Sequence, residues 1–369
     1  MGKASKKNPI RVLQIGMHDK IGGVETYLMN YYRNIDKSKV QFDFVSIYEK
    51  LCFEDEIKKM KGKIYHITSM KKKPIKYYYG LKKIIADNNY KIVHINMLSA
   101  ANILPLLIAK NMKVKNIIAH SHNTNTPSGL PRKFLDKLNR KKITKANHYW
   151  ACSKKAGIWL FGEKSVDKIE IINNAIDYDK FSFDLDQRNL VRQQLNIQNK
   201  FVIGNVARFS YQKNQSFLID VFHKLQEKIN NSILLLIGEG ELEQELKNKV
   251  DKLGLNDKVI FFGTTNDVGK YLQAMDIFVL PSLFEGLPVT GIEAQASGTY
   301  CIFSSNITEE TKISDNCKFV DLNVNDWVNA IEEIYINGYK KESSNMTEKY
   351  NIRIAAKKLE KKYIDMYNE

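Results

Sequence analysis

Short apolar runs alternate with longer amphipathic segments along the whole chain. Residues 10–15 (IRVLQI) form an apolar run that ends at Gly16, and residues 24–32 repeat their apolar positions at helical spacing. Buried strands that alternate with amphipathic helices are typical of a parallel sheet covered by helices. The same pattern predicts further strands at residues 42–47, 92–95, 116–119, 201–206, 232–237, 259–262 and 276–280, and further helices at residues 214–228, 242–253, 289–296 and 351–369.

The alternation starts again near residue 200, after a polar stretch from Phe183 to Lys200. We interpret this stretch as the connection between two domains, at residues 1–182 and 200–350. The predicted fold class is α/β, with two Rossmann-like, doubly wound parallel sheets. Such sheets bind ligands outside the carboxyl ends of their strands, so two of them facing across a cleft would form a ligand site.

Composition narrows the class of protein. The chain has 369 residues, of which 43% are hydrophobic and 27% charged, which excludes disordered, collagen-like and disulfide-scaffold proteins. Its four cysteines are scattered, which indicates reduced thiols and no zinc site. The first ten residues lack the apolar segment of a secretory signal, and no apolar run approaches the roughly 20 residues that span a bilayer. We therefore expect a cytoplasmic protein.

The net charge of +16 is unevenly distributed. Residues 1–180 hold 35 basic and 15 acidic residues, whereas the remainder holds 22 and 26. This asymmetry indicates an anionic partner for the first half, such as nucleic acid, acidic lipid or a phosphorylated substrate. A lysine-rich surface that is merely solvated fits the same counts.

The second half carries two sets of candidate chemical groups. Glu285 follows the strand at 276–280 and Glu293 lies eight positions later on a helix, so two carboxylates can accept hydrogen bonds from two sets of hydroxyls. Arg208 and Lys213 follow the strand at 201–206, where two cations suit a diphosphate. Solvated surface charges fit the spacing of either set.

The first half offers weaker signals. Gly22–Gly23 precede a helix, where glycines let backbone amides approach a phosphate, although a plain turn fits equally. In the segment HSHNT, His120 and His122 would face opposite ways if the strand continued, and one of them could face a ligand. A structural role for either histidine fits the pattern as well.

Taken together, the motifs resemble those of family 4 glycosyltransferases of the two-domain GT-B class, and among them the bacterial exopolysaccharide and capsular-polysaccharide sugar transferases. The resemblance covers nearly the whole chain. Its motifs are Gly22–Gly23 with Glu25 and Thr26, His122 in HSHNT, the turn from Asn174 to Phe181, Arg208 with Lys213, Gly238–Gly240, and Glu285 with Glu293. Two positions depart from it: Asn96 stands where a second histidine is common, and Ala175 where glycine is usual.

The resemblance implies a retaining hexosyltransferase of exopolysaccharide or capsule biosynthesis. It would move a sugar from a nucleotide diphosphate sugar, expected to be a UDP-sugar, to a lipid-linked saccharide. The leaving diphosphate would assist attack on the same face of the sugar. The helix at 351–369 would return to the first domain.

The resemblance also assigns roles to residues. Arg208 and Lys213 would hold the diphosphate, Glu293 the ribose, and Glu285 the donor sugar, which His122 would approach from the first domain. The implied catalytic residues are His122, Glu285, Arg208 and Lys213, and the implied donor-binding residues are Gly22, Gly23, Arg208, Lys213, Gly238, Gly240, Gly286, Leu287 and Glu293. Neither a metal nor a cofactor is expected, and we interpret the D-x-D strings at 177–179 and 184–186 as chance.

A lipid-linked acceptor would place the protein on the inner face of the cell membrane. Residues 131–142 (PRKFLDKLNRKK) combine apolar and basic side chains, which predicts an interfacial helix assisted by residues 71–73 and 77–79. Packing of Phe134, Leu135 and Leu138 on the sheet is the alternative. The predicted contacts are Arg132, Lys133, Lys137, Arg140, Lys141 and Lys142.

Two other functional classes share part of the pattern. A sugar-nucleotide epimerase of the same architecture would bind the donor and transfer nothing. A nucleic-acid-binding protein would explain the basic charge but neither the Glu285 and Glu293 set nor the glycine loops, so we expect no nucleic acid partner.

Overall fold

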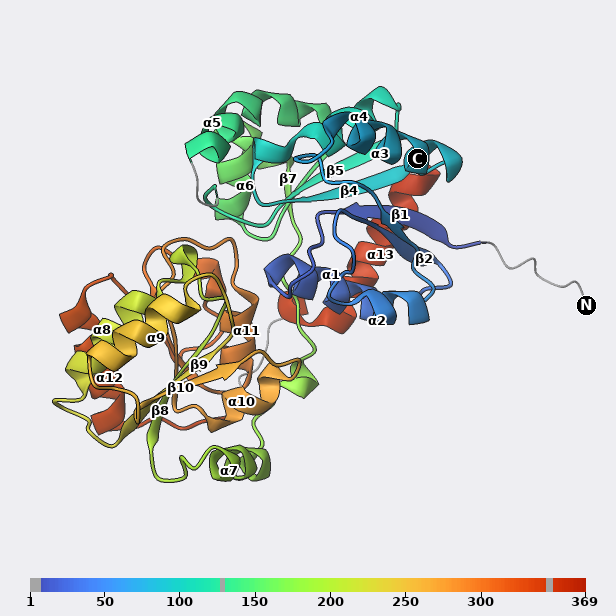
Figure 1. The fold of residues 1–369 in the computed structure, drawn as a ribbon. Coiled ribbons are helices and arrows are strands. Elements are labelled where there is room, and N and C mark those ends of the chain that lie inside the picture. Colours follow the sequence, from blue (N-terminus) through green and yellow to red (C-terminus); the bar gives the residue numbers. More distant parts are fainter. Residues whose placement is uncertain (1–7, 127–129, 343–347) are drawn as a thin grey trace, which may run out of the picture. The chain divides into compact units, whose positions relative to one another are not determined.

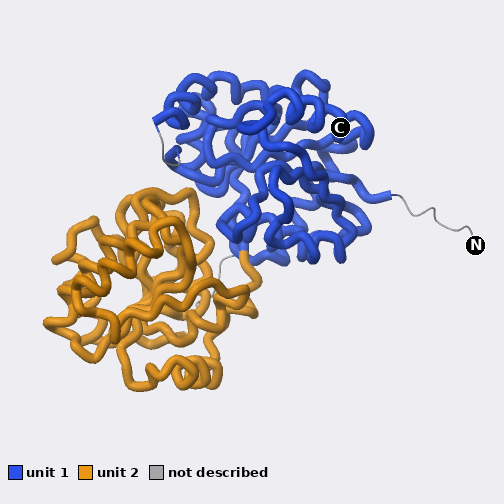
Figure 2. The backbone as a smooth tube through the Cα atoms, viewed as in Figure 1, with its two compact units in different colours: residues 1–175, 348–369 blue, residues 176–347 orange. Residues whose placement is uncertain are grey.

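The computed structural model describes residues 8–126, 130–342 and 348–369. The chain forms two compact units, distinguished by colour in Figure 2. Unit 1 consists of Met1–Ala175 with Glu348–Glu369, and unit 2 of Ile176–Thr347. Residues 1–7, on which the expectation about a secretory signal partly rests, lie outside the described residues.

Unit 1 is built on a seven-stranded parallel sheet in the order β3-β2-β1-β4-β5-β6-β7 (Figure 1). The central strands are buried on both faces, as expected where helices cover both sides of a parallel sheet. The strands are β1 (Ile10–Ile15), β2 (Val40–Ser46), β3 (Ile64–His66), β4 (Ile92–Met97), β5 (Asn116–Ser121), β6 (His148–Ala151) and β7 (Ile169–Ile171), and the helices are α1 (Gly23–Asn34), α2 (Glu54–Lys59), α3 (Pro74–Asp87), α4 (Leu104–Asn111), α5 (Leu130–Asn139), α6 (Lys154–Phe161) and α13 (Ile352–Asn368).

Unit 2 repeats this plan with six parallel strands in the order β10-β9-β8-β11-β12-β13. The strands are β8 (Phe201–Val206), β9 (Ser232–Ile237), β10 (Val259–Gly263), β11 (Ile277–Leu280), β12 (Tyr300–Ser304) and β13 (Cys317–Val320), and the helices are α7 (Leu185–Gln194), α8 (Gln215–Leu225), α9 (Glu243–Lys252), α10 (Val268–Ala274), α11 (Val289–Ala296) and α12 (Val324–Asn337). The predicted α/β class with two parallel-sheet domains is therefore confirmed.

Each sheet reverses its strand order at one place. In unit 1 this switch lies between β1 and β4, and in unit 2 between β8 and β11. Chain segments that leave neighbouring strands there diverge to opposite sides, which opens a crevice at the carboxyl ends of the strands. The loops after these four strands are therefore where ligand-binding residues are expected.

The polar stretch from Phe183 to Lys200 is not a connection between domains, so that interpretation was wrong. It contains α7, whose Arg188 and Arg192 each place a guanidinium nitrogen 2.5 Å from a carboxylate oxygen of Asp276. These contacts attach the segment to unit 2, and the chain passes between the units after Ala175. The hydropathy pattern did not predict that α7 packs on unit 2, because the residues of α7 that face unit 2 include two arginines.

The helix α13 belongs to unit 1, although all of unit 2 precedes it in the chain. It lies beside α1 (Figure 1), and its Leu359 and Tyr363 are part of the buried core on that side of the sheet. Among the described residues, no helix combines the length and the apolar character that crossing a membrane requires.

Candidate active site

The loops at the switch point of unit 2 bring Lys213 and Glu285 together. Lys213 follows β8 and Glu285 follows β11, and the Lys213 Nζ lies 2.5 Å from the Glu285 Oε1. Gln212 donates to the other carboxylate oxygen of Glu285 at 3.2 Å and to the Phe284 carbonyl at 2.9 Å. Both charged side chains are largely buried, so a cation and an anion are fixed side by side at the carboxyl end of the sheet.

Arg208 lies in the same loop but is much more accessible. Its side chain is 56% exposed and pairs with Glu241, the guanidinium Nη2 lying 2.9 Å from Oε2. An exposed pair of this kind contributes only about 0–1 kcal/mol to stability. The Arg208 guanidinium can therefore exchange Glu241 for a stronger anion at little cost.

Close packing of the backbone requires glycine at positions 238 and 240. A Cβ atom at either position would lie 2.1 Å from a backbone oxygen, that of Ala207 for Gly238 and that of Phe209 for Gly240. The Phe209 amide also donates to the Glu239 carbonyl at 2.9 Å. These glycines let the loop after β9 pack on the backbone that carries Arg208.

Glu293 is a buried carboxylic acid on α11. The residue is 6% exposed, and its carboxyl group has no hydrogen-bond partner within the described part of the chain. Burial raises the pKa of Glu293 to about 7 because the charged form loses its hydration. An acid kept in this condition is suited to accept hydrogen bonds from a ligand.

The glycine pair of unit 1 begins α1. Gly22 is the N-cap residue, and a Cβ there would lie 2.9 Å from a carboxylate oxygen of Glu25, whereas a Cβ on Gly23 would meet nothing within 4 Å. Glu25 accepts a hydrogen bond from the His18 amide at 2.9 Å, and burial raises its pKa to about 7. Packing therefore explains why residue 22 is a glycine. It does not explain the glycine at residue 23, where a side chain would extend into open space at the N-terminus of α1.

His120 and His122 do not face opposite ways. Residues two positions apart in a strand lie on the same face of the sheet, so the expectation was wrong, and the two rings stack with centroids 4.0 Å apart. His122 Nε2 lies 2.9 Å from the Asn96 Oδ1. Burial lowers the pKa of His122 to about 3, so the ring is neutral at physiological pH.

The basic segment at residues 131–142 is an α-helix as far as Asn139 and continues as a 3₁₀ helix from Arg140. Asp136 points inward and accepts from the Ala100 amide at 2.7 Å, while Leu130, Phe134 and Leu138 are exposed at spacings of four residues. Leu135 is exposed as well, so the alternative in which Phe134, Leu135 and Leu138 pack on the sheet was wrong.

Two of the predicted interfacial residues have internal roles instead. Arg140 pairs with the buried Asp136 at 2.8 Å and covers the ring of Trp159 at 4.6 Å. Of the tyrosines at 77–79, Tyr77 belongs to the core and only Tyr79 is strongly exposed. The exposed predicted cations are Arg132, Lys133, Lys137, Lys141 and Lys142.

The second D-x-D string has a structural role. Asp184 caps α7 by accepting from the Gln187 amide at 3.0 Å. Among the residues described, no group of three His, Cys, Asp or Glu side chains could hold a metal ion.

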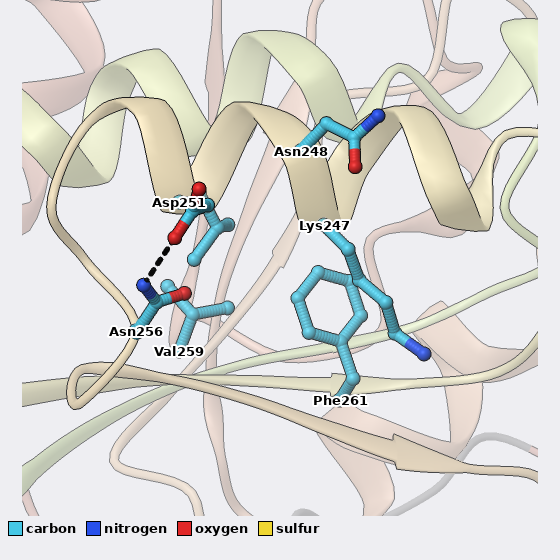
Figure 3. A pocket seen from close by; sticks show the side chains of 7 residues that line it. Lys247, Asn248, Asp251, Asn256, Val259 and Phe261 are labelled. Carbon is cyan, nitrogen blue, oxygen red and sulfur yellow. Dashed lines mark hydrogen bonds between the residues drawn. The ribbon is translucent and has the colours of Figure 1, made fainter.

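A hollow of about 410 Å³ lies elsewhere on unit 2, between α9 and β10 (Figure 3). Asn256 donates to the Asp251 carboxylate there at 2.8 Å, and Lys247 lies over the ring of Phe261. None of the predicted site residues lines this hollow, and it faces the start of β10 rather than the carboxyl end of the sheet.

Comparison with known proteins places these features in a family. The sequence profile for glycosyl transferases group 1 matches residues 186–353, and the profile for glycosyltransferase family 4 matches residues 21–180. EpsF of Bacillus subtilis (strain 168) is 33% identical over 316 residues, which are 83% of this chain and 81% of EpsF. The chain belongs to the family 4 glycosyltransferases. As the resemblance implied, this glycosyltransferase is related to enzymes of polysaccharide biosynthesis.

Two further relatives and one structure extend the comparison. The capsular polysaccharide biosynthesis glycosyltransferase CapH of Staphylococcus aureus is 25% identical, covering 96% of this chain and 99% of CapH. The UDP-Gal:alpha-D-GlcNAc-diphosphoundecaprenol alpha-1,3-galactosyltransferase of Escherichia coli is 28% identical over 80% of each chain. The crystal structure of Anabaena HepE in complex with UDP and glucose shares the fold, with a TM-score of 0.74, 16% identity and 97% of each chain covered.

The sequence alone did not reveal the amide side chains whose hydrogen bonds join the loops and strands of this glycosyltransferase. Gln212 joins the two loops of unit 2, and Asn205, inside an otherwise apolar strand, donates to the Val279 carbonyl at 2.7 Å. Gln14, His94 and Tyr363 form a buried network beneath His122. The sequence did offer one indication of these contacts: Asn205 and Gln14 are polar residues within otherwise apolar strands.

Proposed function

We propose that this glycosyltransferase transfers a hexose from a UDP-sugar to a lipid-linked saccharide with retention of anomeric configuration. The observation that carries the proposal is Glu293, a buried carboxyl group with no hydrogen-bond partner within the described part of unit 2. It lies on α11, the helix that follows the loop in which Glu285 meets Lys213. A ribose offers two adjacent hydroxyls that satisfy such a group. The structure of HepE with UDP and the named UDP-Gal donor of the E. coli relative support uridine as the base.

The cations of unit 2 would bind the diphosphate. Arg208 would leave its exposed pair with Glu241, and Lys213 would share its charge between Glu285 and a phosphate oxygen. As the bond from the anomeric carbon to the phosphate oxygen breaks, negative charge develops on the diphosphate, and preorganised cations stabilise it. Glu285 and the following amides of Gly286 and Leu287 would bind the sugar.

Retention requires the acceptor oxygen to attack on the face that the diphosphate leaves. The acceptor hydroxyl would give its proton to the departing phosphate oxygen while its oxygen bonds to the anomeric carbon. In unit 1, Gly23 at the start of α1 and the neutral His122 would contribute contacts to the substrate. We expect this chemistry to need no metal.

The acceptor side of the proposal rests on unit 1. This unit holds 40 basic and 17 acidic residues, a net charge of +23, whereas unit 2 has a net charge of −7. On α5 the exposed stripe of Leu130, Phe134 and Leu138, with Phe134 64% exposed, is surrounded by exposed cations. A helix with this pattern binds at the boundary between anionic headgroups and acyl chains.

We therefore propose peripheral association with an anionic membrane on its inner face. The diphosphoundecaprenol acceptor named for the E. coli relative supports such a location.

Binding of UDP, measured by calorimetry, tests the donor half. Glu293→Ala should weaken binding at least tenfold, on the scale of hydrogen bonds to a charged group. The matched control is Glu245→Ala, which removes an exposed glutamate of α9 in the same unit and should bind as the unchanged protein does. Equal binding by both variants would contradict the assignment of Glu293.

Release of UDP with and without acceptor separates transfer from the alternative of an epimerase. UDP should accumulate from UDP-sugar only when a lipid-linked saccharide is present. Conversion of the donor sugar to an epimer with no release of UDP would refute transfer.

A further inference from the structure

Asn96 joins the two central strands of unit 1 at the switch point. It lies near the end of β4, and its Nδ2 donates to the carbonyl of Ile15, the last residue of β1, at 3.3 Å and to the Gln14 Oε1 at 3.1 Å. A backbone carbonyl carries no proton, so the amide group facing Ile15 must be the NH₂ end. The Oδ1 end is thereby directed at His122, 2.9 Å from its Nε2.

An amide oxygen only accepts hydrogen bonds, so the His122 Nε2 must carry the proton in this contact. In a neutral imidazole one nitrogen is then a donor and the other an acceptor. The remaining nitrogen, Nδ1, has no hydrogen-bond partner among the residues that the structure describes, and the ring is only partly buried.

We propose that Asn96 holds His122 in the neutral Nε2–H tautomer, so that Nδ1 offers a lone pair to a hydroxyl of the substrate. Asn96 is then a positioning residue, and His122 acts as a hydrogen-bond acceptor rather than as an acid. This inference rests on the proposed function in placing His122 at the substrate. It gives a role to the residue at which the chain departs from the family pattern.

The surroundings of His122 favour the neutral ring. Its faces contact His120, with centroids 4.0 Å apart, and Tyr27, with centroids 5.0 Å apart, and both rings are buried. Burial lowers the pKa of His120 well below its usual range, so that ring is neutral as well. Protonating His122 would place a charge where burial withholds water from it, which lowers its pKa.

A second chain of contacts keeps Asn96 in place. Gln14, which accepts from Asn96, donates through Nε2 to the Tyr363 hydroxyl at 3.3 Å. Tyr363 lies 2.7 Å from the His94 Nδ1, and the His94 Nε2 lies 3.0 Å from the His120 Nδ1. Because these groups are buried, rotating the Asn96 amide would leave several of them without partners, which costs roughly 1–3 kcal/mol for each group.

The first test reads the tautomer directly by NMR on protein with ¹⁵N-labelled histidine, with His122 assigned by its loss in His122→Gln. The expected spectrum shows Nε2 bearing the proton and Nδ1 without one from mildly acidic to mildly basic pH. A proton on Nδ1, or a charged ring at neutral pH, would overturn the proposal. This measurement needs no substrate, so it stands even if the proposed function fails.

The second test adds ligand to the same sample, with binding confirmed by calorimetry. UDP-glucose should shift the Nδ1 resonance in the direction of an accepted hydrogen bond, while UDP alone should leave it in place. If UDP-glucose binds and Nδ1 does not respond, the substrate role of Nδ1 is wrong. If neither ligand binds, the proposed function fails while the tautomer result still decides the role of Asn96.

A variant connects tautomer to rate. Asn96→Leu removes the acceptor while keeping similar bulk, and we expect a mixture of tautomers and a roughly tenfold fall in kcat/KM, the scale of one lost hydrogen bond at an oriented group. A folded Asn96→Leu protein that keeps both the single tautomer and the full rate would contradict the positioning role.

Discussion

Replacing Glu293 with glutamine should stabilise unit 2 in mildly basic solution. Glutamine has nearly the same shape as glutamate but no charge. Burial raises the pKa of Glu293 from 4.5 to about 7, so the folded unit binds this proton more tightly than the unfolded chain does. The carboxyl group therefore costs no stability below its unfolded pKa, and its cost grows as the pH rises from 4.5 towards 7.

The size of the effect follows from the shift. At about 1.4 kcal/mol per pKa unit, full ionisation of Glu293 costs the folded unit about 3 kcal/mol. Between about pH 5.5 and pH 8.5 the cost changes by about 2 kcal/mol. Any fixed difference between the amide and the acid is the same at both pH values. Glu25, whose pKa burial also raises to about 7, lies in unit 1 and is present in both proteins, so its contribution cancels in the comparison.

Hydrogen exchange of amides in β11 and β12, read by mass spectrometry, isolates unit 2 from unit 1. Wild type and Glu293→Gln are compared at the same pH, so intrinsic exchange rates cancel. The ratio of the wild-type rate to the variant rate should rise about thirtyfold from about pH 5.5 to pH 8.5. The same substitution should weaken UDP binding. If the ratio of exchange rates did not change with pH, the conclusion that ionisation of the buried Glu293 destabilises unit 2 would be wrong.

Three further predictions concern other parts of the molecule. Arg208→Ala and Lys213→Ala should each lower kcat by roughly 10²–10³ in an assay of UDP release. Only Lys213→Ala, which removes the cation beside the buried carboxylate of Glu285, should also lower the melting temperature. Replacing Lys133 and Lys137 on α5 with glutamine should weaken co-sedimentation with anionic vesicles about thirtyfold at low salt and little at high salt, at about 1 kcal/mol per lost cation. The same replacement of Lys247 and Lys252 in unit 2 should not weaken it. Equal sedimentation with neutral and anionic lipid would show that these lysines are only solvated. Gly238→Ala should destabilise unit 2, because the added Cβ would lie too close to a backbone oxygen. Gly23→Ala should leave stability unchanged and raise the KM for the donor. A larger fall in melting temperature for Gly23→Ala than for Gly238→Ala would contradict this prediction.

The central strands could be predicted from sequence, because the hydropathy of each strand's own residues is enough to identify it. The strand at residues 10–15 and the strand at 201–206 were predicted with the bounds they have, since continuous apolar runs mark strands buried on both faces. The peripheral strands β3 and β7 were not predicted, because they have three residues each and are half-exposed. Such short segments carry no periodicity.

The candidate site was predictable in its charged residues and not in the contacts that orient them. The loops after β8 and β11 could be expected to meet because neighbouring parallel strands end at the same edge. The pairing of Asn96 with His122 depends on the register in which β4 and β5 pair, and the contact of Gln14 with Tyr363 depends on α13. Local patterns cannot predict contacts that only the tertiary fold creates.

The location of α13 also constrains how the protein is made. Leu359 and Tyr363 complete the core of unit 1, yet the whole of unit 2 is synthesised before them. Unit 2 is a single continuous stretch and can close its own core while still attached to the ribosome, since domains fold as units during synthesis. Unit 1, although translated first, cannot complete the core that α1 and α13 share until α13 emerges. The core of unit 1 can therefore be completed only after the whole of unit 2 has been synthesised.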